Sequence, residues 1–211
     1  MVERIWTWAI IGLLLYACEP ASPPESTDKP AYIPITAKSV DGISLDADWE
    51  KSIKYLSKKS GYQLDTVENH VFNLDGGGEG LLIHSHNEKL YFIYRKEHLP
   101  DRIAGIIVLS DQCRTEEGIY IGMSLGELSV LMPDFNIKPN LMPPPEEIYL
   151  PKKYQTYRHK RQYSAFTIGF YSADGKLLGK YAESEDYTEK GTTEFNSLNG
   201  NVATIEMHII E

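Results

Sequence analysis

The sequence predicts an α+β domain, with a mostly antiparallel sheet built from hairpins and one or two short helices packed on it. Short segments of alternating apolar and polar residues outnumber helical segments, and turn residues separate them. The predicted strands follow one another without the crossover of a dozen or more residues that a parallel pair requires. These two observations favour antiparallel α+β topology over a parallel α/β fold.

The first 17 residues are predicted to be a signal peptide. The apolar run at residues 5–17 is shorter than the about 20 residues that a membrane span needs, and it ends in a small residue before Cys18. Leu15-Tyr16-Ala17-Cys18 resembles the lipobox of bacterial lipoproteins. The resemblance implies that Cys18 becomes a lipid-bearing N-terminus, which anchors the protein to a membrane of the bacterial cell envelope on its periplasmic or surface face.

Residues 18–32 are predicted to be the lipidated N-terminus and a disordered tether, because they are rich in Pro, Ser and acidic residues. Residues 33–211 are predicted to form a single α+β domain of ordinary size. The sequence holds 2 cysteines, so lipidation of Cys18 would leave Cys113 without an internal disulfide partner. Core packing must therefore stabilise the domain.

A first helix is predicted at about residues 47–60, where Asp46 or Asp48 can cap the N-terminus. Its buried face would comprise Trp49, Ile53 and Leu56. A hairpin is expected next, with strands at about residues 80–86 and 90–95 around Asn87-Glu88.

Third and fourth strands are expected at residues 102–110 and 118–122, and a helix after Ser124 must end by Pro133. Residues 136–151 are expected to be irregular, with Pro143, Pro144 and Pro145 as a stiff connector.

Residues 163–182 are predicted to form a hairpin, because Asp174-Gly175 supplies the positive φ angles of a tight turn. An acidic loop at about residues 183–201 and a final strand at residues 202–210 complete the predicted domain.

Ser124 fits two motifs with different functions. Gly122-Met123-Ser124-Leu125-Gly126 matches the G-x-S-x-G elbow of serine hydrolases, and Asp174 and His208 follow in the required order. Ser124 and Glu127 also match the S-x-x-E box that caps a helix. The short following helix, the hairpin context and the position of His208 inside a strand favour the cap. A serine hydrolase remains the alternative.

The same stretch resembles a short motif of the small outer-membrane lipoproteins of the β-barrel assembly machinery. The matching residues are Gly122, Met123, Ser124, Glu127 and Leu131. Those proteins place their helices before a three-stranded sheet, whereas at least two predicted strands come first here. The resemblance implies an envelope scaffold.

No cofactor, metal site or catalytic residue is predicted. The glycine-rich residues 74–80 favour a turn, with a weak cation site at Asp75 and Glu79 as the alternative. His84 and His86 would share a strand face, but zinc needs further ligands. Cys113 is interpreted as a structural thiol.

A basic, tyrosine-rich segment at residues 151–163 stands out because the formal net charge is -9. We define this basic segment by Lys152, Lys153, Tyr154, Tyr157, Arg158, Lys160, Arg161 and Tyr163. Lysine and arginine attract anionic groups, and tyrosine side chains stack on planar rings. The alternative is a solvated edge strand whose cations prevent edge-to-edge pairing.

These features predict a lipid-anchored, non-enzymatic binding or scaffold module. The membrane is reached through the lipid on Cys18, and the basic segment is expected to contact a protein or an anionic envelope component. Secretion argues against a nucleic acid partner. Besides the serine hydrolase, an inhibitor or immunity protein is the remaining alternative.

Overall fold

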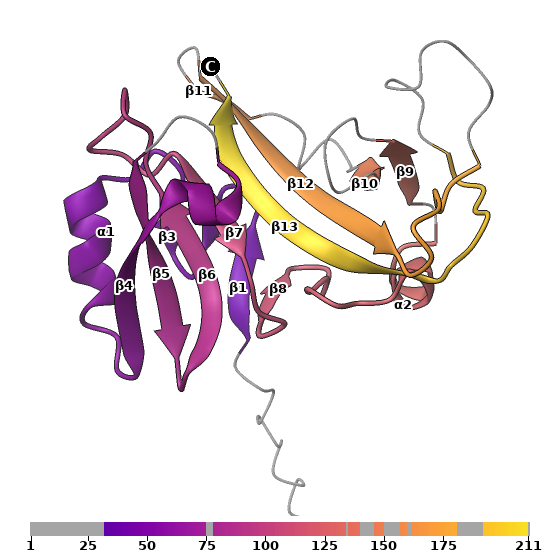
Figure 1. The fold of residues 1–211 in the computed structure, drawn as a ribbon, viewed down its shortest axis with the longest axis horizontal. Coiled ribbons are helices and arrows are strands. Elements are labelled where there is room, and N and C mark those ends of the chain that lie inside the picture. The colour runs from indigo at the N-terminus through magenta and orange to yellow at the C-terminus, as the bar shows by residue number, and fades with distance from the viewer. Residues whose placement is uncertain are drawn as a thin grey trace, which may run out of the picture. The chain divides into compact units, whose positions relative to one another are not determined.

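The structure is a computed structural model that describes residues 32–74, 78–133, 135–139, 146–149, 157–159, 162–180 and 192–210 (Figure 1). The chain divides into two units, Met1–Ala31 and Tyr32–Glu211, and all described residues belong to the second. The predicted signal peptide, Cys18 and nearly all of the predicted tether therefore lie outside the described residues. Within these residues, no helix is both long and apolar enough to cross a membrane.

The predicted α+β class is confirmed, because strands dominate the described residues and almost all of them pair antiparallel. Two α-helices accompany them, α1 (Trp49–Leu56) and α2 (Leu125–Leu131), with a 3₁₀ helix at Asn69–Phe72. The predicted first helix is confirmed with a shorter extent. Its N-cap is Asp48, whose side chain accepts a hydrogen bond from the backbone N–H of Lys51.

A small sheet at the start of the domain was not predicted from the sequence. Among the described residues its strand order is β3-β2-β1-β8. The strands are β1 (Ile33–Thr36), β2 (Ser39–Val40), β3 (Ile43–Ser44) and β8 (Cys113–Thr115). β1 and β8 run parallel, with Ile33 opposite Cys113, which is an exception to the antiparallel pattern.

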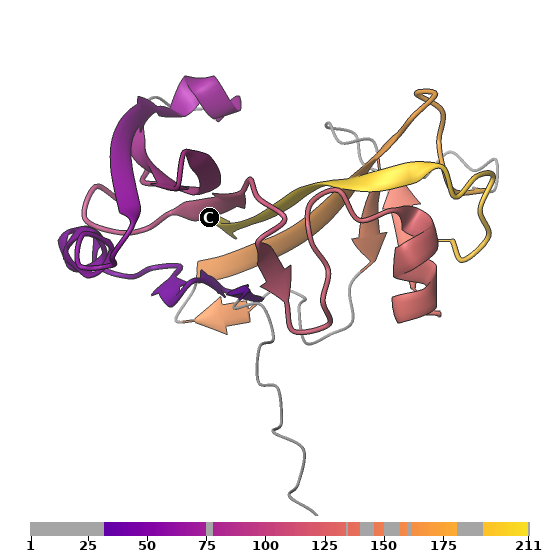
Figure 2. The ribbon, with the colours of Figure 1, turned by 90° about the horizontal axis from the view of Figure 1, so that it is seen from below.

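The larger sheet has the order β4-β5-β6-β7-β13-β12-β10-β9 in the described part of the chain, and β11 pairs with β12. Its strands are β4 (Tyr62–Glu68), β5 (Glu79–Ser85), β6 (Glu88–Tyr94), β7 (Gly105–Val108), β9 (Asn136–Pro139), β10 (Glu146–Tyr149), β11 (Tyr157–His159), β12 (Gln162–Ser172) and β13 (Gly200–Ile210). α1 lies beside β4, and α2 lies at the Gly200 end of β13 (Figure 1 and Figure 2).

The predicted hairpin of β5 and β6 is confirmed, and so are the third strand, as β7, and the final strand, as β13. The tight turn lies one residue earlier than predicted, at His86 and Asn87, whose φ angles are 50° and 68°. A two-residue hairpin turn requires positive φ at both central residues, because this matches the twist of the flanking strands.

The predicted hairpin at residues 163–182 is wrong. The turn exists, with Gly175 at φ 71°, but residues 176–180 do not continue as a strand along β12. β12 pairs instead with β13, and the two long strands run side by side in Figure 1 (orange and yellow). β13 offers an alternating buried face at Val202, Ile205, Met207 and Ile209, which residues 176–180 are too short to provide.

Two further predictions about strands are wrong. Residues 118–122 are not a strand, because Gly118 and Gly122 both have φ 90°, which extended backbone does not allow. Residues 136–151 are not wholly irregular, because β9 and β10 pair antiparallel with Ile137 opposite Ile148. The prolines at 143–145 lie outside the described residues.

β6 is buried on both faces, which its continuous apolar sequence reflects. Tyr91 and Ile93 point into the main core, and Phe92 and Tyr94 point into a smaller cluster. Phe72 of the 3₁₀ helix stacks on Phe92 with ring centroids 4.2 Å apart. The smaller cluster thus covers the second face of the sheet.

We expect Gly105→Ala to lower the free energy of unfolding by about 2–3 kcal/mol. Gly105 is opposite Tyr94, and a Cβ at Gly105 would lie 2.2 Å from Cζ of that buried ring. The ring would have to move out of its cluster. Gly126→Ala is the matched control, because the nearest atom to a Cβ there is 3.9 Å away. Urea denaturation of both variants tests this, and an equal, small effect at both positions would contradict it.

Candidate functional site

Ser124 is the N-cap of α2, which confirms the capping interpretation. The Ser124 side chain accepts a hydrogen bond from the backbone N–H of Glu127 at 3.1 Å, and the Glu127 carboxylate accepts one from the Ser124 backbone N–H at 2.9 Å. The carboxylate also lies 2.7 Å from the Ser124 hydroxyl. These hydrogen bonds with Ser124 hold the pKa of Glu127 below its usual value. The Ser124 hydroxyl therefore caps the N-terminus of α2.

The partners that a catalytic serine would need are not assembled. Ser124 pairs with Asn201 at one end of β13, whereas His208 stands near the other end of that strand. Asn201 and His208 are seven strand positions apart at about 3.3 Å each, so His208 lies about 23 Å along β13 from the residue that pairs with Ser124. Burial lowers the pKa of His208, and the charge of Lys96 lowers it further. The strand expected to enter the elbow is also absent from residues 118–122.

We expect Ser124→Ala to lower the free energy of unfolding by about 1 kcal/mol, because one N-terminal N–H of α2 loses its acceptor. The same hydroxyl should not react with a fluorophosphonate probe, since its neighbouring carboxylate, Glu127, is held in the helix cap and His208 lies at the far end of β13. Thermal unfolding and probe labelling of the wild type and the variant check both statements. Labelling of the wild type that the variant loses would support the hydrolase instead.

The histidine pair loses its geometric support as the start of a zinc site. His86 lies in the hairpin turn, so it does not share a strand face with His84 as the sequence suggested. Nε2 of His84 lies 2.9 Å from Oδ2 of Asp65, an ion-pair distance without good hydrogen-bond geometry. Glu79 accepts a hydrogen bond from Arg95 at 2.8 Å, and Asp75 lies outside the described residues. Among the described side chains, no three metal-ligating residues converge.

The basic segment lies mostly outside the described residues, as do all of its lysines, Lys152, Lys153 and Lys160, together with Tyr154 and Arg161. Tyr157 and Arg158 belong to β11, and Tyr163 belongs to β12. The backbone pairs Arg158 with Tyr163 in an antiparallel bridge. Their side chains are outside the described part of the structure.

A buried acidic residue that sequence reasoning missed organises the small sheet. Asp41 is 9% exposed and occupies the β2–β3 turn at φ 57°, followed by Gly42 at φ 84°. Its Oδ2 accepts hydrogen bonds from the hydroxyls of Tyr62 and Tyr91, each at 2.9 Å. Its Oδ1 lies 2.5 Å from Nζ of Lys59. We call these four residues the Asp41 cluster.

Two segments distant from the β2–β3 turn meet Asp41 in the Asp41 cluster, residues 59–62 and strand β6. Lys59 follows α1, Tyr62 begins β4, and Tyr91 lies within β6. The signal in the sequence is the dipeptide Asp41-Gly42, which is typical of a tight hairpin turn between strands. That signal predicts the turn, but it does not predict the partners of the carboxylate.

The electrostatics keep both phenols of the cluster protonated. Burial is the main cause that raises the pKa of Tyr62 and of Tyr91, and the nearby Asp41 carboxylate raises both further. Burial also raises the pKa of the neighbouring Cys113 thiol to about 12, again with Asp41 as the next cause. Each phenol is thus a hydrogen-bond donor to Asp41, and neither is a base or nucleophile at neutral pH.

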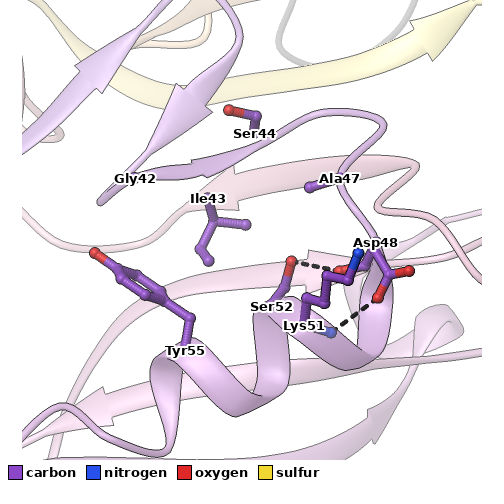
Figure 3. A pocket seen from close by; sticks show the side chains of 8 residues that line it. All are labelled: Gly42, Ile43, Ser44, Ala47, Asp48, Lys51, Ser52 and Tyr55. Atoms are coloured by element: carbon purple, nitrogen blue, oxygen red, sulfur yellow. Dashed lines mark hydrogen bonds between the residues drawn. The ribbon is translucent and has the colours of Figure 1, made fainter.

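A small open cleft lies between the β2–β3 turn and α1 (Figure 3). Its volume is about 230 Å³. Figure 3 shows Tyr55 and Gly42 at one end, and Asp48 and Lys51 at the other. Tyr55 also donates a hydrogen bond to the backbone carbonyl of Asp41 at 3.4 Å, so the cleft borders the Asp41 cluster.

We expect the Cys113 thiol to resist labelling in the folded protein. Cys113 is fully buried, and its pKa of about 12 leaves far less thiolate than an ordinary cysteine has. A Cys18→Ser protein should react with a disulfide reagent at pH 8 about a thousandfold more slowly than the same protein in denaturant. Equal rates in both conditions would contradict the buried position.

Comparison with known proteins gives a weak structural similarity. No protein-family profile and no curated protein matches the chain. A solved structure, "Crystal structure of the uncharacterized protein yfeY from Escherichia coli", is similar over 84% of this chain and 99% of that chain. The sequence identity is 13% and the TM-score is 0.46.

Proposed function

We propose that the protein is a lipid-anchored component of the bacterial cell envelope whose domain is a non-enzymatic binding or scaffold module. The observation that carries the anchor is the sequence Leu15-Tyr16-Ala17-Cys18 after a short apolar run. Acyl chains on Cys18 would hold the domain at a membrane face, since each buried methylene contributes about 0.8 kcal/mol.

The non-enzymatic part of the proposal rests on the chemistry of the candidate nucleophiles. The Ser124 hydroxyl takes part in the α2 cap, and the Cys113 thiol is buried with a raised pKa. Neither group is poised to attack a substrate.

The proposed partner is a protein or an anionic envelope component, bound through the basic segment. An acidic chain with a formal net charge of -9 is repelled by anionic surfaces unless a local group of cations offsets the repulsion. Lysines and arginines interleaved with tyrosines are suited to that role.

Lipidation is tested by metabolic labelling with an alkyne-bearing fatty acid. The wild type should incorporate the label and stay with membranes after a salt wash, whereas Cys18→Ser should do neither. Label on the Cys18→Ser protein would place the lipid elsewhere, and an unlabelled wild type would overturn the anchor.

Partner binding is tested by crosslinking and pull-down of the full lipidated protein from its own envelope. The test variant changes Lys152, Lys153, Arg158, Lys160 and Arg161 to Ser. A matched control removes the same number of charges from exposed positions of the described domain, by changing Lys51, Lys54, Lys58, Lys89 and Lys176 to Ser. Loss of a partner with the test variant alone supports the basic segment. The same partners with all three proteins would contradict it.

A further inference from the structure

The ammonium group of Lys59 is surrounded by acceptors from three parts of the chain. Nζ lies 2.5 Å from Oδ1 of Asp41 and 3.3 Å from the backbone oxygen of the same residue. It also lies 4.9 Å from the ring centroid of Tyr55 and 5.3 Å from that of Tyr62. Both distances are within the about 6 Å over which an aromatic face attracts a cation.

Much of this cage is held in place by contacts that do not involve Lys59. The Asp41 carboxylate accepts from Tyr62 and Tyr91, and the Asp41 backbone N–H donates to the carbonyl of Pro34 at 3.0 Å. Tyr91 is fully buried in β6. Because the walls belong to the β2–β3 turn, α1 and β4, the cage should persist when the lysine side chain is removed.

The cage is also open to solvent on one side. The Lys59 side chain is 26% exposed, and Tyr55 is 46% exposed. Tyr55 and Gly42 line the adjoining cleft (Figure 3). Gly42 allows this arrangement, since a Cβ there would lie 3.0 Å from the Tyr55 hydroxyl oxygen. A small molecule could therefore reach the position of the Lys59 ammonium.

We propose that Asp41, Tyr55 and Tyr62 form a binding site for primary ammonium groups, which the chain's own Lys59 occupies. A primary ammonium has three N–H donors, and Asp41 offers it a carboxylate oxygen and a backbone carbonyl while the two rings contact the remaining surface. A quaternary ammonium retains the attraction to the rings but lacks the N–H donors. The site therefore prefers primary amines.

Lys59 acts as a tethered competitor at this site. Its effective concentration near the cage is at least in the millimolar range, because α1 and β4 hold both ends of its segment close by. An external amine consequently binds the wild type much more weakly than it binds a variant that lacks the lysine side chain.

The test is rescue of Lys59→Ala by n-butylammonium. This cation replaces the removed ammonium and most of its methylene stem. At a concentration about ten times its dissociation constant, it should raise the melting temperature by about 3–6 °C above that in sodium chloride of equal ionic strength. Tetramethylammonium should raise it less. The wild type should not respond.

Two control variants make the result specific. Lys59→Met keeps an unbranched apolar stem in the cage, so it should not respond to n-butylammonium. Lys59→Ala combined with Asp41→Asn removes the carboxylate charge and should lose most of the rescue. No difference between n-butylammonium and sodium chloride for Lys59→Ala would overturn the proposal. Should Lys59→Ala be unfolded alone, the amine must restore its folded circular dichroism signal, and failure to do so overturns the proposal equally.

Discussion

Replacing Asp41 with alanine is expected to lower the free energy of unfolding by about 3–5 kcal/mol. The change removes the acceptor for two tyrosine hydroxyls and leaves the Lys59 ammonium without its carboxylate partner. Alanine must also adopt the left-handed backbone of φ 57°, which it tolerates less well than aspartate does. Partial exposure of Lys59 places the charge contribution at the lower end of its usual range.

Urea denaturation measures this effect, with Asp41→Asn as the control. Asparagine tolerates the left-handed backbone and keeps an oxygen acceptor, so it isolates the loss of the charge. We expect Asp41→Asn to lose about half as much stability as Asp41→Ala. A loss below about 1 kcal/mol for Asp41→Ala would show that the Asp41 cluster does not stabilise the fold.

Alkaline unfolding is the second large effect that we expect, beginning near pH 10. Burial raises the pKa of Tyr91, Tyr94 and Cys113 in the folded protein, that of Cys113 to about 12. In the unfolded chain these groups release protons at about pH 8.5 for cysteine and about pH 10 for tyrosine. Their contribution to stability is complete below those values and is lost as the pH rises toward the folded pKa values.

The expected slope is steep. Each group contributes about 1.4 kcal/mol per pH unit once the unfolded chain has lost its proton and the folded protein has not. Above pH 10 the three groups together lower the free energy of unfolding by about 4 kcal/mol per pH unit. An ordinary domain would therefore lose its whole free energy of unfolding within about two to three pH units.

Circular dichroism and tyrosinate absorbance, recorded together against pH, check this expectation. The exposed tyrosines ionise first, and the rest of the tyrosinate absorbance should change together with the circular dichroism, because the buried tyrosines ionise when the chain unfolds. Cys113→Ala removes one proton-releasing group, so the slope of its stability against pH should fall by about a third. Tyrosinate absorbance that rises fully while the circular dichroism is unchanged would contradict the burial of these side chains.

Local sequence signals predicted the local structure of this domain well. The Asp48 cap of α1, the Ser124 capping box and the β5–β6 hairpin each depend on residues within a few positions of one another. The predicted β12 hairpin failed for the opposite reason. Asp174-Gly175 does form a turn, but β12 has a better partner in β13, whose alternating apolar residues lie after a further intervening segment. Burial along the longer strand outweighs proximity along the chain.

The Asp41 cluster was beyond sequence reasoning because its members are spread along the chain. Lys59, Tyr62 and Tyr91 stand 18, 21 and 50 residues after Asp41. No spacing rule joins an acidic residue in a turn to a tyrosine on a strand of another sheet. Only the left-handed turn at Asp41-Gly42 was accessible from the sequence, as a common hairpin dipeptide.

The position of β13 between β7 and β12 has a consequence for the order of folding. Ile205 pairs with Val108 on one side and with Ile168 on the other. A chain synthesised from its N-terminus can complete the β4–β7 meander early, but the outer edge of β7 stays unpaired until β13, almost a hundred residues later, has been made. During that interval the edge is a template for pairing with other chains. Protection of this edge is therefore a requirement of folding as well as of stability.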